Sequence, residues 1–191
     1  MNQNVMIVGV GGQGSLLASK MLGHVVMQAG YDVKVSEVHG MSQRGGSVVT
    51  YVRYSDEAVW SPVINEGEAD IIISFELLEA ARWVGFLKKG GTLVVNDQKI
   101  APMPVIMGNA QYPEDIAEKL RELGVNLKIF DALHLAEEAG SAKAANVVLM
   151  GAVANAMDFP EEMWQKALEE CVPPKFLELN RKAFALGRAQ K

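Results

Sequence analysis

The sequence predicts an α/β protein with a three-layer, Rossmann-like architecture, in which a mixed, mainly parallel sheet is joined to a helical C-terminal extension. Three observations favour this class. Short β-branched runs alternate with helical segments through the first 131 residues, the order that builds a parallel sheet covered by helices. The first run ends in a cluster of glycines and leads at once into a helix, as strand–loop–helix units do. Beyond residue 131 the segments are helical.

Length and composition are those of one globular domain. A chain of 191 residues can bury a sizeable core, and 49% hydrophobic with 21% charged residues is typical of a soluble folded protein. We therefore expect a single domain over residues 1–191, with its α/β core in 1–131 and the helical extension in 132–191.

The same composition excludes several classes of function. A formal net charge of −5 argues against nucleic-acid binding, because phosphate neutralisation requires a basic face. No apolar run approaches the roughly 20 residues of a membrane span, and no signal segment opens the chain, so neither a membrane anchor nor secretion is expected. The single cysteine, Cys171, can form no internal disulfide and cannot supply an iron–sulfur cluster, which favours a cytoplasmic setting.

The expected elements follow in chain order. Strands are expected at residues 5–8, 32–36, 47–54, 69–74, 92–96 and 125–130, with a short additional strand at 105–106. Helices are expected at 16–27, 75–87 and 113–123, and then at 132–138, 146–157, 160–171 and 175–188. The run Lys88-Lys89-Gly90-Gly91 is interpreted as the end of the second helix. Because a loop and not a helix precedes the third strand, that strand is expected to be antiparallel.

The first glycine loop is the leading candidate for a binding site. Three of its glycines match the dinucleotide fingerprint G-x-G-x-x-G between a strand and a helix. Backbone N–H groups and the positive end of the helix dipole would converge on an anion there. A tight turn without a ligand remains the alternative, and Ser15 is interpreted chiefly as a helix cap. The residues of this loop are Gly9, Gly11, Gly12, Gln13, Gly14 and Ser15.

A second polar loop follows the second strand. Glu37 falls where a dinucleotide enzyme places its ribose-binding acid, yet the chain then enters a loop and a strand instead of a helix. Arg44 offers a planar cation for phosphate or carboxylate, and His39 is a proton donor, a hydrogen-bond anchor or a packed imidazole. A solvated connection is the alternative, and no metal-ligand spacing is present. The candidates in this loop are Glu37, His39, Ser42, Gln43, Arg44 and Gly45.

Four further polar residues have plainer interpretations. Glu76 follows a strand and is expected at a helix N-terminus, where the helix dipole favours an acid. Asn96 and Asp97 are explained by a turn after the next strand, and Asn146 by a helix cap.

The motifs GVGGQG at residues 9–14 and E-x-HGMSQRGG at residues 37–46, taken in order, resemble the gamma subunit, or gamma domain, of the 2-oxoacid:ferredoxin oxidoreductases. The resemblance covers essentially the whole chain and is greatest to the small subunits of the indolepyruvate branch. It implies a subunit of an enzyme that converts a 2-oxoacid such as indolepyruvate, with coenzyme A and oxidised ferredoxin, into an acyl-CoA, carbon dioxide and reduced ferredoxin.

The resemblance also implies partners. The chain has no thiamine-diphosphate signature and only one cysteine, so thiamine diphosphate and iron–sulfur clusters are expected on a large partner subunit, through which ferredoxin is reached. Coenzyme A is the candidate ligand of the glycine loops, no catalytic residue is assigned, and the isolated chain is expected to be inactive. Two alternatives stay open: a free-standing NAD(P)- or flavin-binding enzyme, and a non-catalytic nucleotide-binding assembly module. Formation of a homodimer by the isolated chain also stays open.

The two loops are expected to form one anion site, with Arg44 as its fixed charge. If the first two strands are adjacent and parallel, their carboxyl ends lie about 5 Å apart in the hydrogen-bonding direction. The glycine loop would then supply N–H donors, and the second loop would supply the guanidinium.

Overall fold

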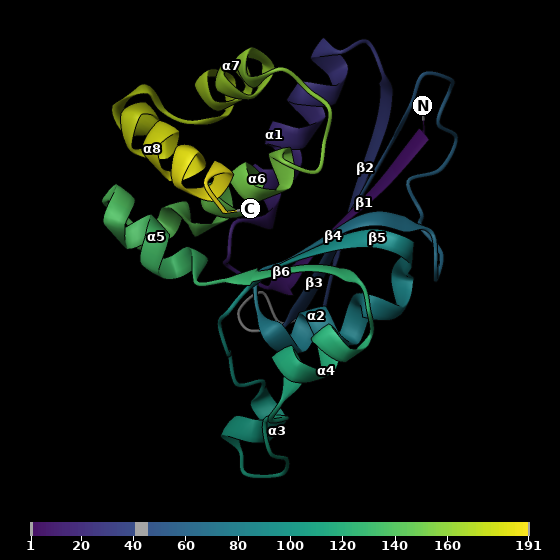
Figure 1. The fold of residues 1–191 in the computed structure, drawn as a ribbon, viewed down its shortest axis with the longest axis vertical. Helices are drawn as coiled ribbons and strands as arrows, with labels where there is room; N and C mark the ends of the chain where they lie inside the picture. Colours follow the sequence, from purple (N-terminus) through teal and green to yellow (C-terminus); the bar gives the residue numbers. More distant parts are fainter. Residues whose placement is uncertain (1, 41–45, 191) are drawn as a thin grey trace.

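The structure, a computed structural model, describes residues 2–40 and 46–190. Within them, a six-stranded sheet lies between two helical layers (Figure 1). The strand order is β2-β3-β1-β4-β5-β6. The predicted α/β class with a mixed sheet is confirmed. The strands are β1 (Asn2–Val10), β2 (Asp32–His39), β3 (Ser47–Ser55), β4 (Ala69–Ser74), β5 (Leu87–Asn96) and β6 (Asn126–Phe130).

One face of the sheet is covered by α1 and α6, with α5, α7 and α8 packed around them, and the other face by α2 and α4 (Figure 1). The helices are α1 (Ser15–Gln28), α2 (Leu77–Trp83), α3 (Met103–Ile106), α4 (Ile116–Glu122), α5 (Ala132–Ala139), α6 (Ala145–Ala154), α7 (Glu161–Cys171) and α8 (Leu177–Arg188). Short 3₁₀ turns occupy Val84–Phe86, Ala142–Ala144 and Pro174–Phe176. No helix among the described residues is long and apolar enough to cross a membrane.

The third strand is antiparallel, as predicted, but its position changes the geometry of the site. β3 pairs with β2 on one side and with β1 on the other, antiparallel to both. The expectation that the first two strands are neighbours is therefore wrong. β2 ends at His39 and β3 begins at Ser47, and these consecutive strands pair with each other. β3 also pairs with β1, so β2 lies at the sheet edge.

The strands on the other side of β1 follow the parallel pattern. β4 pairs with β1, β5 with β4, and β6 with β5, all parallel. α1 covers one face of the sheet after β1, whereas α2 covers the opposite face after β4. The chain thus changes direction between β1 and β4, and open α/β sheets bind their ligands in the crevice at such a switch point.

Two local predictions are wrong. Residues 105–106 belong to the short helix α3 and not to a strand. The run from Lys88 to Gly91 does not end a helix, because α2 stops at Trp83 and β5 already begins at Leu87. The pairing of β5 with β4 shifts register at this run. Glycine suits position 91 there, because a Cβ on Gly91 would lie only 3.0 Å from the carbonyl oxygen of Asp70. The Lys88 ammonium forms an ion pair with the Asp70 carboxylate.

α6 is the central helix of the C-terminal region. All its residues from Asn146 to Ala154 are buried, as a helix that is apolar on every side requires. It belongs to the same core cluster as β1, β4 and α1, so the C-terminal helices complete the covering of the sheet. The division of the chain at residue 131 into a core and an extension stays a prediction.

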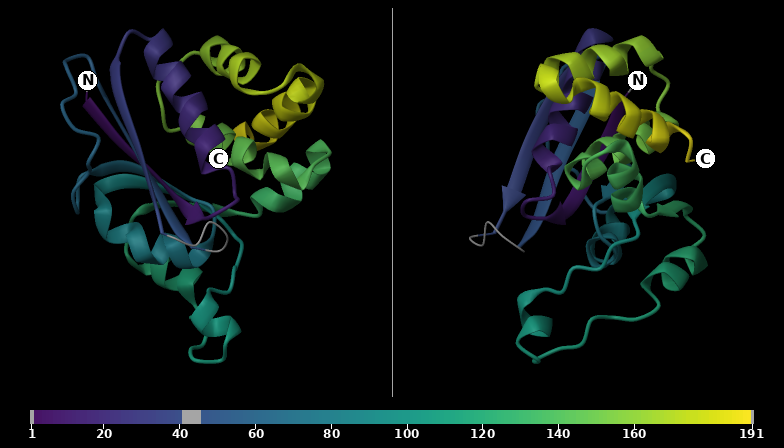
Figure 2. Two further views of the ribbon diagram at one scale, coloured as in Figure 1. Left: turned by 180° about the vertical axis from the view of Figure 1, so that it is seen from behind. Right: turned by 90° about the vertical axis from the view of Figure 1, so that its left-hand side faces the viewer.

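Residues 97–115, called the arm below, connect β5 to α4 and include α3. The arm projects beyond the layer formed by α2 and α4 and carries α3 away from the rest of the molecule (Figure 2).

Candidate functional site

The glycine loop lies at the carboxyl end of β1, and sterics explain three of its glycines. Gly12 and Gly14 have φ of 96° and 88°, a region in which side chains are strained. A Cβ on Gly9 would lie 2.8 Å from Gln13 Oε1 and 2.9 Å from the Phe75 Cβ. A Cβ on Gly14 would overlap the amide of Asn146, whereas one on Gly12 would meet nothing within 4 Å. The backbone at Gly12 is therefore open to a ligand.

Ser15 has a different role from the predicted one. Gly14 is the N-cap of α1 and no side chain caps this end. The Ser15 hydroxyl instead donates a hydrogen bond to Glu37 Oε2 at 3.2 Å, and the Thr50 hydroxyl donates to the same oxygen at 3.1 Å. Glu37 thus connects the glycine loop to β2 and β3. Among the described residues, the N–H groups of Ser15 and Leu16 have no acceptor, as at any helix start without a capping side chain.

Two hollows flank the glycine loop, and Gly12 and Gly14 line both. The first, called the loop–β2 hollow, has a volume of about 380 Å³. It contains the carboxylate of Glu37, which disfavours an anion unless a cation compensates it. Its lining residues are Gly11, Gly12, Gly14, Ser15, Leu16, Glu37, His39 and Val48.

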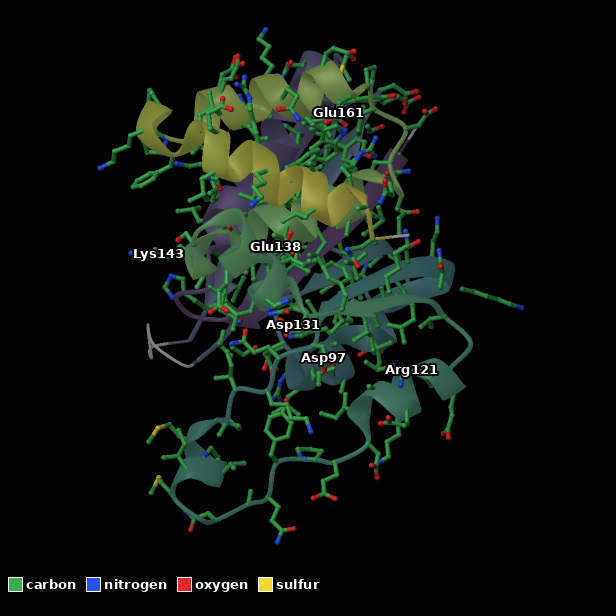
Figure 3. The ribbon with its side chains drawn as sticks, turned by 60° about the vertical axis from the view of Figure 1, so that its left-hand side comes forward. Asp97, Arg121, Asp131, Glu138, Lys143 and Glu161 are labelled. Carbon is green, nitrogen blue, oxygen red and sulfur yellow. The ribbon has the colours of Figure 1, made fainter. Side chains whose placement is uncertain are left out.

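The second hollow, called the switch-point hollow, lies at the ends of β1, β4 and β5 and has a volume of about 420 Å³. Lys143 is the one charged residue among its described lining residues. Figure 3 shows Lys143 at the margin of the helical layer, with Asp97 and Asp131 lower in the view, after β5 and β6. The lining consists of Gly12, Gln13, Gly14, Phe75, Asn96, Gln98, Ile100, Leu133, Ala142, Lys143 and Ala145.

A network of amide side chains fixes the floor of the switch-point hollow. Gln13 Oε1 accepts from the Val10 N–H at 2.8 Å, and Gln13 Nε2 donates to the Phe75 carbonyl at 3.1 Å. Asn96 Nδ2 donates to the same carbonyl at 3.2 Å, while Asn96 Oδ1 accepts from the Ala132 N–H at 2.9 Å. These bonds join the ends of β1, β4 and β5 to the start of α5, so the floor of the hollow is preorganised.

The second loop is only partly described. Ser42, Gln43, Arg44 and Gly45 lie outside the described residues. The Gly46 carbonyl accepts a 3.0 Å hydrogen bond from the Gly11 N–H, so this loop ends against the first one. Glu37 and His39 line the same hollow as the first loop, which brings together the described members of both predicted sets. His39 Nδ1 lies 3.3 Å from the Gly40 carbonyl oxygen.

Two plainer interpretations have different outcomes. Glu76 is the N-cap of α2, as predicted, and its carboxylate accepts from the Glu79 N–H. Asn146 is not a cap. It lies inside α6, where its side-chain amide donates to the Gly14 carbonyl at 3.3 Å and so fastens α6 to the glycine loop.

No sequence motif marks Lys143, Gln98 or Tyr112 as site residues. Lys143 lies in a 3₁₀ turn far along the chain, and no motif marks it. Tyr112 donates a 2.9 Å hydrogen bond to Glu76 Oε2 and accepts one from the Leu78 N–H at 3.1 Å. Only the fold brings these residues to the edge where β4 and β5 end.

Glu76 should make the stability of the protein depend on pH. Burial raises the pKa of its carboxyl above the ordinary value of 4.5, although hydrogen bonds from backbone N–H groups and from Tyr112 oppose the shift. The folded state holds the Glu76 proton more tightly than the unfolded state does. The stability that the protonated carboxyl contributes is therefore fully present below about pH 4.5 and is lost as the pH rises through the raised pKa. Glu76→Gln cannot titrate, so its unfolding free energy should fall less between about pH 4.5 and about pH 8 than that of the native chain.

Urea denaturation at a series of pH values measures this difference. Glu122→Gln, on the exposed surface of α4, is the control and should keep the native pH dependence. If the unfolding free energies of Glu76→Gln and of the native chain changed equally with pH, the raised pKa of Glu76 would be contradicted.

Comparison with known proteins identifies the class. The chain belongs to the pyruvate ferredoxin/flavodoxin oxidoreductase family, whose pattern matches residues 4–190. It is 47% identical over 189 residues to the indolepyruvate oxidoreductase subunit IorB of Thermococcus kodakarensis, covering 96% of this chain and 93% of the relative. The chain is therefore a small subunit of a 2-oxoacid:ferredoxin oxidoreductase, and the predicted family is confirmed.

Solved structures agree. The gamma subunit of a keto/oxoacid ferredoxin oxidoreductase from Geobacter sulfurreducens superposes with a TM-score of 0.71 at 25% identity, covering 97% of this chain and 95% of that one. A 2-oxoglutarate:ferredoxin oxidoreductase from Magnetococcus marinus, solved with 2-oxoglutarate, coenzyme A and succinyl-CoA, shares the fold with a TM-score of 0.76 at 20% identity. The match covers 99% of this chain and 31% of that longer chain. Chains of this family work as part of complexes in which other subunits carry thiamine diphosphate and iron–sulfur clusters.

Proposed function

We propose that this subunit completes the coenzyme A site of an aryl 2-oxoacid:ferredoxin oxidoreductase, with indolepyruvate as the substrate class and the glycine loop as the phosphate-binding element. A large partner subunit holds the thiamine diphosphate and the iron–sulfur clusters and passes electrons to ferredoxin. The observation that carries the proposal is the glycine loop at the switch point, where open backbone at Gly12 lies beside the lysine of a polar hollow.

The chemistry of the hollow favours an anion with a large neutral body. Lys143 supplies the charge, the start of α1 supplies N–H donors, and the amides of Gln13, Asn96 and Gln98 supply neutral hydrogen-bonding groups. Coenzyme A combines phosphates with an extended amide-containing arm, and the Magnetococcus marinus relative was solved with it bound. The family membership favours this function over a free-standing nicotinamide or flavin enzyme.

The loop–β2 hollow remains the other proposed site for the anion. Its candidates Glu37, His39, Ser42, Gln43, Arg44 and Gly45 stay proposals, with Arg44 as the cation that offsets Glu37. A cytoplasmic location and transfer to ferredoxin also stay proposals, the first supported by the single cysteine of the sequence.

The isolated chain should be colourless and inactive, whereas the chain co-expressed with its large subunit should reduce a dye when indolepyruvate and coenzyme A are both supplied. The reason is that one cysteine cannot hold an iron–sulfur cluster, for which about four cysteine ligands are typical. Visible spectra and initial rates of both preparations measure this. Turnover by the isolated chain, or stoichiometric flavin absorbance, would contradict the proposal. Activity of the complex with other 2-oxoacids but not with indolepyruvate would remove the substrate assignment.

A further inference from the structure

The arm, residues 97–115, presents apolar side chains that this chain does not cover. Met103, Ile106 and Met107 are 58%, 66% and 65% exposed on and just after the one-turn helix α3. Hydrogen bonds close the tip on itself, since the N–H groups of Asn109 and Ala110 both donate to the Pro104 carbonyl. A four-residue helix gains little stability from its own backbone, so a protruding apolar tip of this kind is suited to burial against another protein.

The base of the arm, in contrast, is fastened to the body on both sides. On the leg that leaves β5, the Leu77 N–H donates to the Gln98 carbonyl at 2.9 Å. Burial raises the pKa of the Glu76 carboxylate, and the backbone N–H of Ile100, on the same leg, is among the groups that oppose that shift. On the returning leg, the Tyr112 hydroxyl donates to the same carboxylate at 2.9 Å. Glu76 is only 1% exposed. The buried acid therefore holds the returning leg and its neighbour Leu77 holds the leaving leg, so the direction in which the tip projects is fixed.

The base of the arm is also continuous with the switch-point hollow. Gln98 and Ile100 line that hollow. Phe75, next to Glu76, accepts the hydrogen bonds of Gln13 and Asn96 that fix its floor. A protein that grips the arm near its base therefore lies beside the hollow. This continuity selects the occupant, because the proposed function requires the thiamine-bearing subunit to reach the same hollow.

We propose that the arm is a docking element for the large subunit of the same enzyme, with Met103, Ile106 and Met107 inserted into an apolar pocket of that subunit and Glu76 holding the arm in position. The proposal rests on the proposed function for the identity of the partner. It assigns the tip of the arm to subunit recognition and leaves the coenzyme A contacts to the glycine loop, Lys143 and the base of the arm at Gln98.

Association of the full-length chain with the purified large subunit tests the proposal by sedimentation or interferometry, independently of activity. Met107→Lys should raise the Kd about ten-fold and the double variant Ile106→Lys/Met107→Lys further, as loss of a buried anchor does. Met27→Lys is the matched control, because Met27 is 62% exposed on α1 and lies outside the arm. It should leave the Kd within about two-fold of the native value, as a surface change outside an interface does.

A second variant separates the base of the arm from its tip. Tyr112→Phe keeps the ring but removes the hydroxyl bond to Glu76, so amide hydrogen exchange in the arm should become faster and the Kd for the large subunit should rise. Complexes of the tip variants, assembled at high concentration, should keep the native KM for coenzyme A, which distinguishes docking from ligand binding.

Three outcomes would overturn the proposal. The first is an unchanged Kd in both tip variants, and the second is an equal rise in the Met27→Lys control. The third is an effect confined to self-association of the isolated chain, which would assign the tip to a second copy. Failure of the native complex to oxidise indolepyruvate would instead remove the proposed function and leave the measured subunit affinity valid.

Discussion

Gly187→Ala should destabilise the protein by about 3 kcal/mol, an unusually large effect for the addition of one methyl group. Gly187 lies in α8 against α6. A Cβ there would fall 2.8 Å from the Val148 carbonyl carbon, closer still to its oxygen, and 3.1 Å from the Ala152 nitrogen. These are backbone atoms of a buried helix and cannot rotate away, so α6 and α8 would have to move apart.

Gly151 lies on the opposing surface of the same contact. A Cβ on this glycine would lie 3.0 Å from the Arg188 nitrogen and closer to the Phe184 carbonyl oxygen. Because either methyl group separates the same two helices, the double variant Gly151→Ala/Gly187→Ala should lose less than the sum of the two single losses.

Gly23→Ala is the matched control for this prediction. Gly23 lies inside α1, and a Cβ there would meet nothing within 4 Å. Alanine should therefore stabilise the chain by about 0.5–1 kcal/mol, its ordinary advantage inside a helix. Chemical denaturation measures all four variants. A Gly187→Ala variant as stable as the native chain would show that α6 and α8 do not approach so closely.

The sequence predicts the parts of the fold that depend on local patterns. Strand runs, the glycine loop and the C-terminal helices follow from residue type and period. The antiparallel third strand follows from the missing helix after Glu37. The order of strands does not, because pairing β3 with β1 depends on which sheet edge is free. The role of Gly187 cannot be predicted from the sequence either, since nothing around a glycine in a helix indicates which distant backbone packs against it.

In the candidate site, too, the residues of a local motif can be predicted, whereas contacts between distant parts of the chain cannot. Gly9, Gly12 and Gly14 could be predicted because their spacing between a strand and a helix carries the motif. The type and position of Ser15 predict a helix cap, yet the fold places Glu37 within reach of its hydroxyl. Lys143 could not be predicted, since nothing near it in the sequence relates it to residues some 130 positions earlier. Long-range placement, and not residue chemistry, is what the sequence leaves open.

Lys143→Ala should raise the KM for coenzyme A about ten-fold or more in the assembled enzyme, because a charge-assisted bond to phosphate contributes roughly 1.5–3 kcal/mol. Decarboxylation of the 2-oxoacid in the absence of coenzyme A should change much less. Lys166→Ala, an exposed lysine on α7, is the matched control and should leave the KM unchanged.

Arg44→Ala decides between the two hollows that share Gly12. If the phosphate lies in the switch-point hollow, Lys143→Ala raises the KM and Arg44→Ala does not. If it lies in the loop–β2 hollow, Arg44→Ala raises the KM by a similar factor, since Glu37 then needs its counter-charge. Gly12→Val should be harmful in either case, because its side chain enters the space that both hollows share at a φ of 96°. Steady-state kinetics with coenzyme A as the varied substrate distinguish these outcomes. If Lys143→Ala, Arg44→Ala and Gly12→Val all kept the native KM, the phosphate would bind elsewhere. Neither the two cations nor the open backbone at Gly12 would then contribute to phosphate binding.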